Sequence, residues 1–146
     1  MLALIYFILI LGLIVFIHEL GHFIFAKKAG VHCYEFSLGM GPKIYSFRRK
    51  NDETTYSIRA FPIGGFVSMA GESVEEDQNI PKDRSLQAKT WGQRFMTMAG
   101  GVLFNFILAI VLFFIVGLVA GSPGSKTYVT ELESDLPASE YLKVGD

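Results

Sequence analysis

The sequence predicts a membrane α-helical protein with two transmembrane helices and a small β insertion between them. Two long apolar segments lead to this prediction. Residues 2–26 form a 25-residue segment whose apolar run is interrupted only by one histidine-containing motif, and residues 95–120 form 26 residues without a charge. Each segment exceeds the roughly 20 residues that a helix needs to cross a bilayer. The hydrophobic content of 51% agrees with a chain that spans the membrane twice.

The first segment, assigned to residues 1–27, carries His18-Glu19-Leu20-Gly21-His22, which has the pattern H-E-x-x-H. On a helix His18 and His22 lie one turn apart and face the same way, so their ring nitrogens can bind one metal ion. Glu19 is placed to polarise a metal-bound water. Ionisable residues inside a membrane span are costly and therefore indicate a functional site. The structural alternative is a buried polar cluster that ties two helices together.

The basic residues predict the topology. Of the 13 Lys and Arg residues, 11 lie from Lys27 to Arg94, so the positive-inside rule places the central region in the cytoplasm and both termini outside the inner (plasma) membrane. A signal peptide fits poorly, because no basic residue precedes the apolar segment and no small-residue cleavage pattern follows it. Eight acidic residues are interspersed with the basic ones, so no nucleic-acid partner is indicated.

The second segment, residues 95–120, contains Asn105 as its most polar member. Glu19 lies eight residues before Lys27, or roughly 12 Å along a helix, and Asn105 lies 11 residues after Arg94, or roughly 16 Å. We therefore expect Asn105 to lie within about one helical turn of the depth of the histidine motif. Hydrogen bonding between the two helices, without a catalytic part, is an alternative role for this residue.

The central region, residues 28–71, has a strand-like pattern. Residues 33–38, 42–49 and 54–61 alternate as strands do, and residues 50–53 form a turn. We expect a membrane-associated hairpin, whose exposed edge can hold an extended peptide by strand addition. The alternative is that its aromatic residues only pack a small β layer. Residues 72–94 are expected to form an acidic linker, followed by a short interfacial helix that Ser85 caps.

Two single residues have open assignments. His32 lies beyond the end of the first helix and is either an interfacial side chain or, less simply, a metal ligand. Cys33 is the only cysteine, so it cannot form an intramolecular disulfide. On the cytoplasmic side we expect a reduced thiol, with metal ligation as the alternative.

Four separated motifs together resemble the site-2 protease family, and within it the bacterial regulator-of-sigma-E type of RIP metalloprotease. The resemblance covers nearly the whole chain, with its motifs in family order. The motifs are His18-Glu-Leu-Gly-His-Phe23, Phe36-Ser-Leu-Gly-Met-Gly-Pro42, Arg59-Ala-Phe-Pro-Ile-Gly-Gly-Phe-Val67 and Ala99-Gly-Gly-Val-Leu-Phe-Asn105. Residues 121–146 resemble the beginning of a PDZ domain.

The resemblance implies a zinc endopeptidase of regulated intramembrane proteolysis, which cuts transmembrane segments such as those of anti-sigma factors. It implies that His18 and His22 are zinc ligands and that Glu19 is the general base. The expected partners are the lipid bilayer and a transmembrane protein substrate. Residues that the resemblance places at the substrate are Asn105, Gly64 and Gly65.

One element of the family pattern is missing from this sequence. The family's third zinc ligand is an aspartate of an Asp-Gly motif in a later span, and a catalytic zinc normally has three protein ligands. We therefore expect this chain to be the N-terminal part of a longer protease, with little proteolysis on its own. The alternative is an inactive membrane remnant or binding module that engages a partner through its β region and PDZ-like tail.

Overall fold

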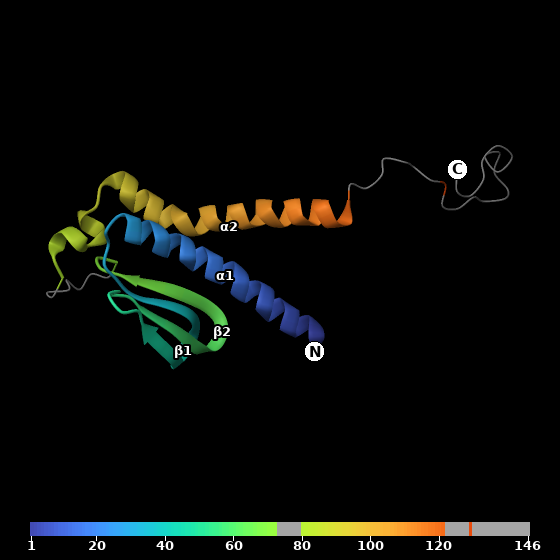
Figure 1. Cartoon of the computed structure of the whole chain (residues 1–146), viewed down its shortest axis with the longest axis horizontal. Helices are drawn as coiled ribbons and strands as arrows, with labels where there is room; N and C mark the ends of the chain where they lie inside the picture. Colours follow the sequence, from blue (N-terminus) through green and yellow to red (C-terminus); the bar gives the residue numbers. More distant parts are fainter. Residues whose placement is uncertain (73–79, 122–128, 130–146) are drawn as a thin grey trace. The chain divides into compact units, whose positions relative to one another are not determined.

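The computed structural model describes residues 1–72, 80–121 and 129. The chain divides into two compact units, Met1–Leu112 and Phe113–Asp146, and the first unit contains the histidine motif and the hairpin. In chain order the elements are α1 (Leu2–Lys28), β1 (Cys33–Arg48), β2 (Thr55–Met69), the 3-10 turns η1 (Lys82–Arg84) and η2 (Leu86–Ala88), and α2 (Trp91–Ala120). Figure 1 shows α1 between the hairpin and the first part of α2.

The predicted fold class is confirmed in its main elements. Both α1 and α2 are long and apolar enough to cross a membrane, and a two-stranded antiparallel sheet lies between them in the sequence. Large apolar side chains along the first half of α1 are exposed, as lipid contact would require. The predicted PDZ-like beginning, residues 121–146, lies outside the described residues except for 121 and 129, and residues 73–79 of the predicted linker also lie outside them.

Helix α1 ends through a local signal in the sequence. Lys27 and Lys28 lie in its last turn, where positive charge interacts favourably with the helix dipole. Gly30 then adopts a left-handed conformation with φ of 71°, and the Val31 N–H donates to the Ala26 carbonyl at 2.9 Å. A glycine at this place closes a helix at little steric cost. The chain is thereby directed into β1.

The two strands form a long hairpin that bends over itself. The predicted turn at residues 50–53 is present, with Asn51 in the left-handed region at φ of 73°. The bend lies where Gly39 has φ of 87°, and a Cβ atom there would come within 2.5 Å of the Phe61 carbonyl oxygen. Because of the bend, Phe36 lies opposite both Val67 and Tyr56 in the register. Strand β1 therefore continues through Gly39 and Gly41, whereas the sequence pattern predicted separate strands at 33–38 and 42–49.

The core lies where the second half of α1 meets the hairpin and η2. Partly buried residues of α1, among them Phe16 and Phe23, pack against it, and each of these two rings contacts the ring of Phe36. Its buried members are Ala26, Val31, Cys33, Phe36, Val67, Met69 and Leu86. This packing holds the end of β2 against the helix turn that carries the H-E-x-x-H motif.

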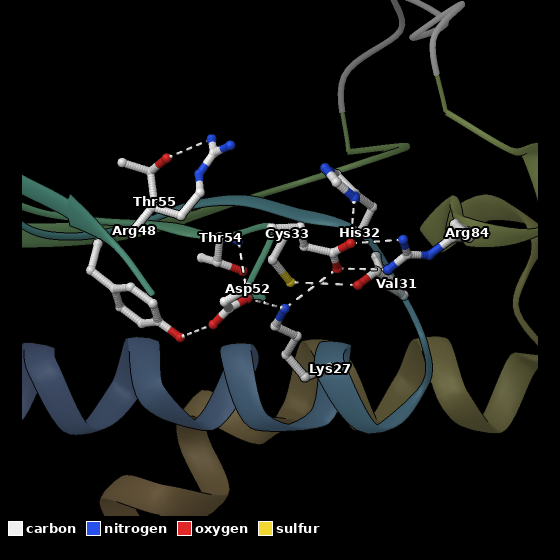
Figure 2. A network of polar contacts seen from close by, with 11 residues as sticks. Lys27, Val31, His32, Cys33, Arg48, Asp52, Thr54, Thr55 and Arg84 are labelled. Carbon is white, nitrogen blue, oxygen red and sulfur yellow. Dashed lines mark hydrogen bonds and ion pairs between the residues drawn. The ribbon is translucent and has the colours of Figure 1, made fainter. Parts of the chain in front are cut away.

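A polar network joins the turn of the hairpin to the end of α1 and to η1 (Figure 2). Lys27 of α1 lies 2.9 Å from an Asp52 oxygen and 3.4 Å from a Glu53 oxygen. Arg84 of η1 donates to both oxygens of Glu53, at 2.7 and 2.6 Å. Nδ1 of His32 lies 3.1 Å from the same carboxylate. The network therefore anchors the hairpin turn at the C-terminal end of α1.

The network shifts the pKa values of its members. Hydrogen bonds from Arg84 hold the pKa of Glu53 at about 2. Hydrogen bonds from the Thr54 N–H and Lys27 hold the pKa of Asp52 well below its usual range. Burial, together with a hydrogen bond to Asp52, raises the pKa of Tyr56 to about 12. Burial raises the pKa of the Cys33 thiol to about 11, so this cysteine is a protonated, packed side chain.

Helix α2 begins at Trp91, four residues before the uncharged segment of the sequence. Thr90 caps it: its hydroxyl accepts from the Gln93 N–H at 3.4 Å, and the Gln93 side-chain oxygen accepts from the Thr90 N–H at 3.1 Å. This reciprocal arrangement is a capping box. The predicted Ser85 cap is also present, but it accepts from Gln87 N–H at the start of the short turn η2. Trp91, which lies within the range predicted for the linker and interfacial helix, is thus the first residue of α2.

Candidate metal centre

The two histidines of the motif face each other on α1. Nε2 of His18 and Nε2 of His22 are 3.2 Å apart, and the two rings meet edge to face with centroids 4.8 Å apart. One helical turn separates the two residues, so the backbone of α1 alone sets this approach. The predicted convergence of the two ring nitrogens is therefore confirmed.

Helix α2 contacts the outer nitrogen of each histidine. Nδ1 of His22 donates to the Thr97 carbonyl at 2.8 Å, and the Asn105 side-chain amide lies 3.3 Å from Nδ1 of His18. Thr97, Gly101 and Asn105 are spaced four residues apart, so they form one stripe along α2. The prediction that Asn105 lies at the depth of the motif is confirmed by its contact with His18.

The close approach of the helices depends on glycine. A Cβ atom at Gly21 would lie 2.2 Å from the Gly100 carbonyl oxygen, which no side chain tolerates. A Cβ atom at Gly101 would lie 2.5 Å from Nε2 of His22 and 2.7 Å from Nε2 of His18. Gly101 thus leaves open a space beside the Nε2 atoms of both histidines. Gly21 and Gly100 allow the helix backbones to touch at this level.

The histidine pair fits a zinc ion. Zinc binds histidine nitrogen at about 2.0–2.1 Å, so a tetrahedral site separates two such nitrogens by about 3.3 Å, close to the 3.2 Å in this structure. Histidine ligands of zinc usually donate from their other nitrogen to a carbonyl or carboxylate, as His22 does to Thr97, whereas Nδ1 of His18 faces the amide nitrogen of Asn105. Among residues 1–72, 80–121 and 129, however, no third His, Cys, Asp or Glu joins the pair. The described residues thus offer two ring nitrogens at a spacing that suits zinc.

Glu19 and His22 line a pocket of about 300 Å³ between α1, the end of β2, η2 and α2. The pocket is large enough for several water molecules, each of which occupies about 30 Å³. Its lining combines five apolar residues with four polar or ionisable ones, among them Glu72. The other lining residues are Phe66, Val67, Met69, Leu86, Thr97 and Met98.

The other predicted site residues divide into near and distant ones. Gly65 lies beside the motif, since a Cβ atom there would come within 3.1 Å of Cγ of Glu19. Gly64 faces Met40 across the bend of the hairpin and has φ of 87°. His32 pairs with Glu53 in the anchoring network, and Cys33 is fully buried, so neither lies at the histidine pair.

Two contributors to the site, Thr97 and Gly101, were not predicted from the sequence. For Gly101 the available signal was its place four residues before Asn105. Thr97 acts through its backbone carbonyl, which no residue type specifies. Its hydroxyl is buried and has no hydrogen-bond partner among the described residues.

The comparison with protein families decides the assignment. Residues 6–142, nearly the whole chain, match the profile of Peptidase family M50. The chain belongs to peptidase family M50, the site-2 proteases. The histidine pair, the carboxylate between them and the glycine-lined helix contact are thus features of an M50 chain.

Named relatives of this M50 chain are zinc metalloproteases. Zinc metalloprotease RasP of Geobacillus kaustophilus is 33% identical over 220 aligned positions, which cover 99% of this chain and 52% of the relative. A putative zinc metalloprotease of Clostridium perfringens is 40% identical over 143 positions, covering 97% and 40%. One of Clostridium acetobutylicum is 41% identical over 140 positions, covering 95% and 39%. The M50 chain spans about half the length of these relatives or less.

Proposed function

We propose that this chain forms the zinc-binding and catalytic part of an endopeptidase of regulated intramembrane proteolysis. In this proposal His18 and His22 bind zinc, and Glu19 is the general base. The observation that carries the proposal is the pair of Nε2 atoms 3.2 Å apart, next to a carboxylate that lines a pocket. Membership of family M50 and the names of the relatives support it.

The residues of the site then have separate tasks. Bound zinc would polarise the scissile carbonyl and acidify a water molecule. Glu19 accepts the proton of the attacking water and later donates it to the leaving amide nitrogen. The Thr97 carbonyl fixes the ring of His22, and the pocket beside Glu19 has room for the attacking water.

The substrate proposal rests on β2. Gly65 lies next to Glu19, and a glycine allows the backbone of a second chain to approach closely. We propose that an extended transmembrane segment, of the anti-sigma factor type, lies along the strand at Gly64 and Gly65, with Asn105 near its path. Strand addition would supply backbone hydrogen bonds without regard to sequence.

The proposed setting is the inner (plasma) membrane, with the hairpin and η turns in the cytoplasm and both termini outside. The concentration of basic residues between the two helices supports this orientation. Cysteine-accessibility labelling of intact cells tests it: single cysteines near residue 50 should react only after permeabilisation, and labelling without permeabilisation would reverse the topology.

Zinc content of the purified chain in detergent tests the site. We expect the wild-type chain to bind zinc weakly, since the described residues supply two ligands, and His18→Ala and His22→Ala to bind far less. Glu19→Gln should keep the zinc, because Glu19 is not a ligand in this proposal. Equal zinc content in all four proteins would refute the ligand assignment.

A model transmembrane substrate tests the chemistry. We expect little cleavage by this chain alone, and full activity would refute the inference that a further ligand is needed. Glu19→Gln in a chain of the relatives' length should abolish cleavage and leave substrate capture intact.

A membrane binding module without catalysis is the second candidate. The absence of a third ligand among the described residues favours it, as does the exposed apolar surface of the hairpin around Ile44 and Phe61. Glu19→Gln separates the candidates, because a pure binding module would lose nothing on this substitution.

A further inference from the structure

The site contains a chain of hydrogen bonds with a defined direction. The Asn105 amide nitrogen can only donate hydrogen bonds, so it donates to Nδ1 of His18 across 3.3 Å. A neutral His18 then carries its proton on Nε2, which donates to Nε2 of His22 across 3.2 Å. His22 in turn donates from Nδ1 to the Thr97 carbonyl at 2.8 Å. Without a metal ion, each histidine ring thus has one nitrogen that donates a hydrogen bond and one that accepts.

Metal binding conflicts with the hydrogen bonding of His18 but not with that of His22. His22 already carries its proton on Nδ1, so its Nε2 lone pair is free for a metal. His18 carries its proton on Nε2, where a metal would bind. To become a ligand, His18 must lose the Nε2 proton and take up one on Nδ1, with no change in the number of protons on the ring. The new Nδ1–H would then point at the donor hydrogens of Asn105.

Asn105 holds the group that resolves the conflict. Its side-chain oxygen Oδ1 is buried and has no hydrogen-bond partner among the described residues. Leaving a buried acceptor unpaired is unfavourable. A half-turn of the amide about the Cβ–Cγ bond exchanges its oxygen and nitrogen, so that Oδ1 accepts from the Nδ1–H of His18.

We propose that Asn105 is a positioning residue for the metal centre, whose amide rotates when zinc binds and holds His18 in the Nδ1–H tautomer. The inference rests on the proposed role of His18 as a zinc ligand. His22 needs no such change, because a carbonyl can only accept and so fixes its tautomer in advance. The two proposed ligands therefore differ. The tautomer of His22 is fixed before zinc binds, whereas the tautomer of His18 changes when zinc binds.

Zinc affinity of four proteins in detergent, at one pH, tests the proposal. Asn105→Leu keeps a branched side chain of similar length but removes the acceptor, and we expect the affinity to fall about 10- to 100-fold. Asn105→Asp keeps an acceptor and should stay near the wild type. Phe106→Leu is the matched control, since Phe106 is 65% exposed on the same helix and takes the same new side chain.

Nitrogen-15 NMR of histidine-labelled chain gives a readout that a merely structural role would not change. We expect His18 to change from the Nε2–H to the Nδ1–H form on addition of zinc, and His22 to be Nδ1–H throughout. In Asn105→Leu the metal-free His18 should be a mixture of both forms. An Nδ1–H form of His18 before zinc addition would overturn the proposed rotation.

The outcomes separate this inference from the proposed function. If His18→Ala binds zinc as well as the wild type, the ligand assignment fails. If His18→Ala loses zinc but Asn105→Leu keeps wild-type affinity, the ligand assignment stands and the role of Asn105 is overturned. Equal losses in Asn105→Leu and Phe106→Leu would also overturn it, because they would indicate a general packing defect.

Discussion

The Thr97 carbonyl accepts a hydrogen bond of 2.8 Å from Nδ1 of His22. This contact is made by a backbone group, so its position is set by the place of α2 against α1 and not by the Thr97 side chain. The orientation of a proposed zinc ligand is thereby tied to helix packing. Changes in the helix contact should therefore alter metal binding even when no ligand is replaced.

Gly101→Ala should lower zinc affinity by more than about tenfold, as loss of an outer contact to a ligand does. A methyl group there would lie 2.5 Å from Nε2 of His22 and 2.7 Å from Nε2 of His18, so the rings must move. Titration of the detergent-solubilised chain with zinc measures this. Gly117→Ala is the matched control on the same helix, because a Cβ atom there has no other group within 4 Å. Wild-type affinity in Gly101→Ala would contradict the placement of the open space.

Gly21→Ala should destabilise the packing of α1 on α2 by about 1–3 kcal/mol, the usual cost of overpacking. The added methyl group would lie 2.2 Å from a backbone oxygen of Gly100, which cannot rotate away. Thermal unfolding in detergent measures the loss. Gly12→Ala on the same helix meets its nearest group only at 3.7 Å and should unfold like the wild type. Equal unfolding of the two variants would show that the helices do not touch at Gly21.

Acid should loosen the anchoring of the hairpin turn. The pKa of Glu53 is lowered from 4.5 to about 2 by its hydrogen bonds with Arg84. A carboxylate whose pKa is lower in the folded state stabilises that state above the unfolded pKa, and this contribution disappears as the pH falls from about 4.5 to about 2. Glu53→Gln should remove about 1 kcal/mol of hairpin protection at neutral pH, since the pair is partly exposed.

Amide hydrogen exchange of residues 33–69, expressed as protection factors, measures the anchoring by Glu53. The wild type and Glu53→Gln should differ at neutral pH and converge near pH 2. A constant difference over this range would mean that the carboxylate charge of Glu53 does not anchor the turn.

Cys33 should resist alkylation. Its side chain is 0% exposed, and burial raises the pKa of its thiol from 9.0 to about 11. Because the thiolate is the reactive form, the pKa alone lowers the rate near pH 8 by about 100-fold. Mass spectrometry after iodoacetamide treatment should show slow labelling of the folded chain and fast labelling after denaturation. Fast labelling of the folded chain would place the thiol at the surface.

Local patterns predicted much of this fold. The helical repeat brings His18 and His22 together, and the two apolar segments predict both helices, because these features depend on short stretches of chain. The start of α2 does not follow from hydropathy, since Arg94 interrupts the apolar pattern, whereas the cap by Thr90 and Gln93 begins the helix earlier.

The contacts of α2 with the site were predictable only in part. The depth of Asn105 follows from counting residues along two helices. Its contact with His18 also requires the right rotation of α2 about its axis, which depends on the long-range contact between Gly21 and Gly100. The carbonyl of Thr97 has no signature in the sequence, because every residue carries one.

The contact of Gly21 with Gly100 has a mechanical consequence. Because the two backbones touch at this point, a change in the crossing angle of α1 and α2 would turn about it. A tilt of α2 about this point moves its distant residues far and its near residues little. His22 and Gly101 are the immediate neighbours of the pivot, and Thr97 lies one turn away. A change in crossing angle would therefore displace His22 less than residues farther along either helix.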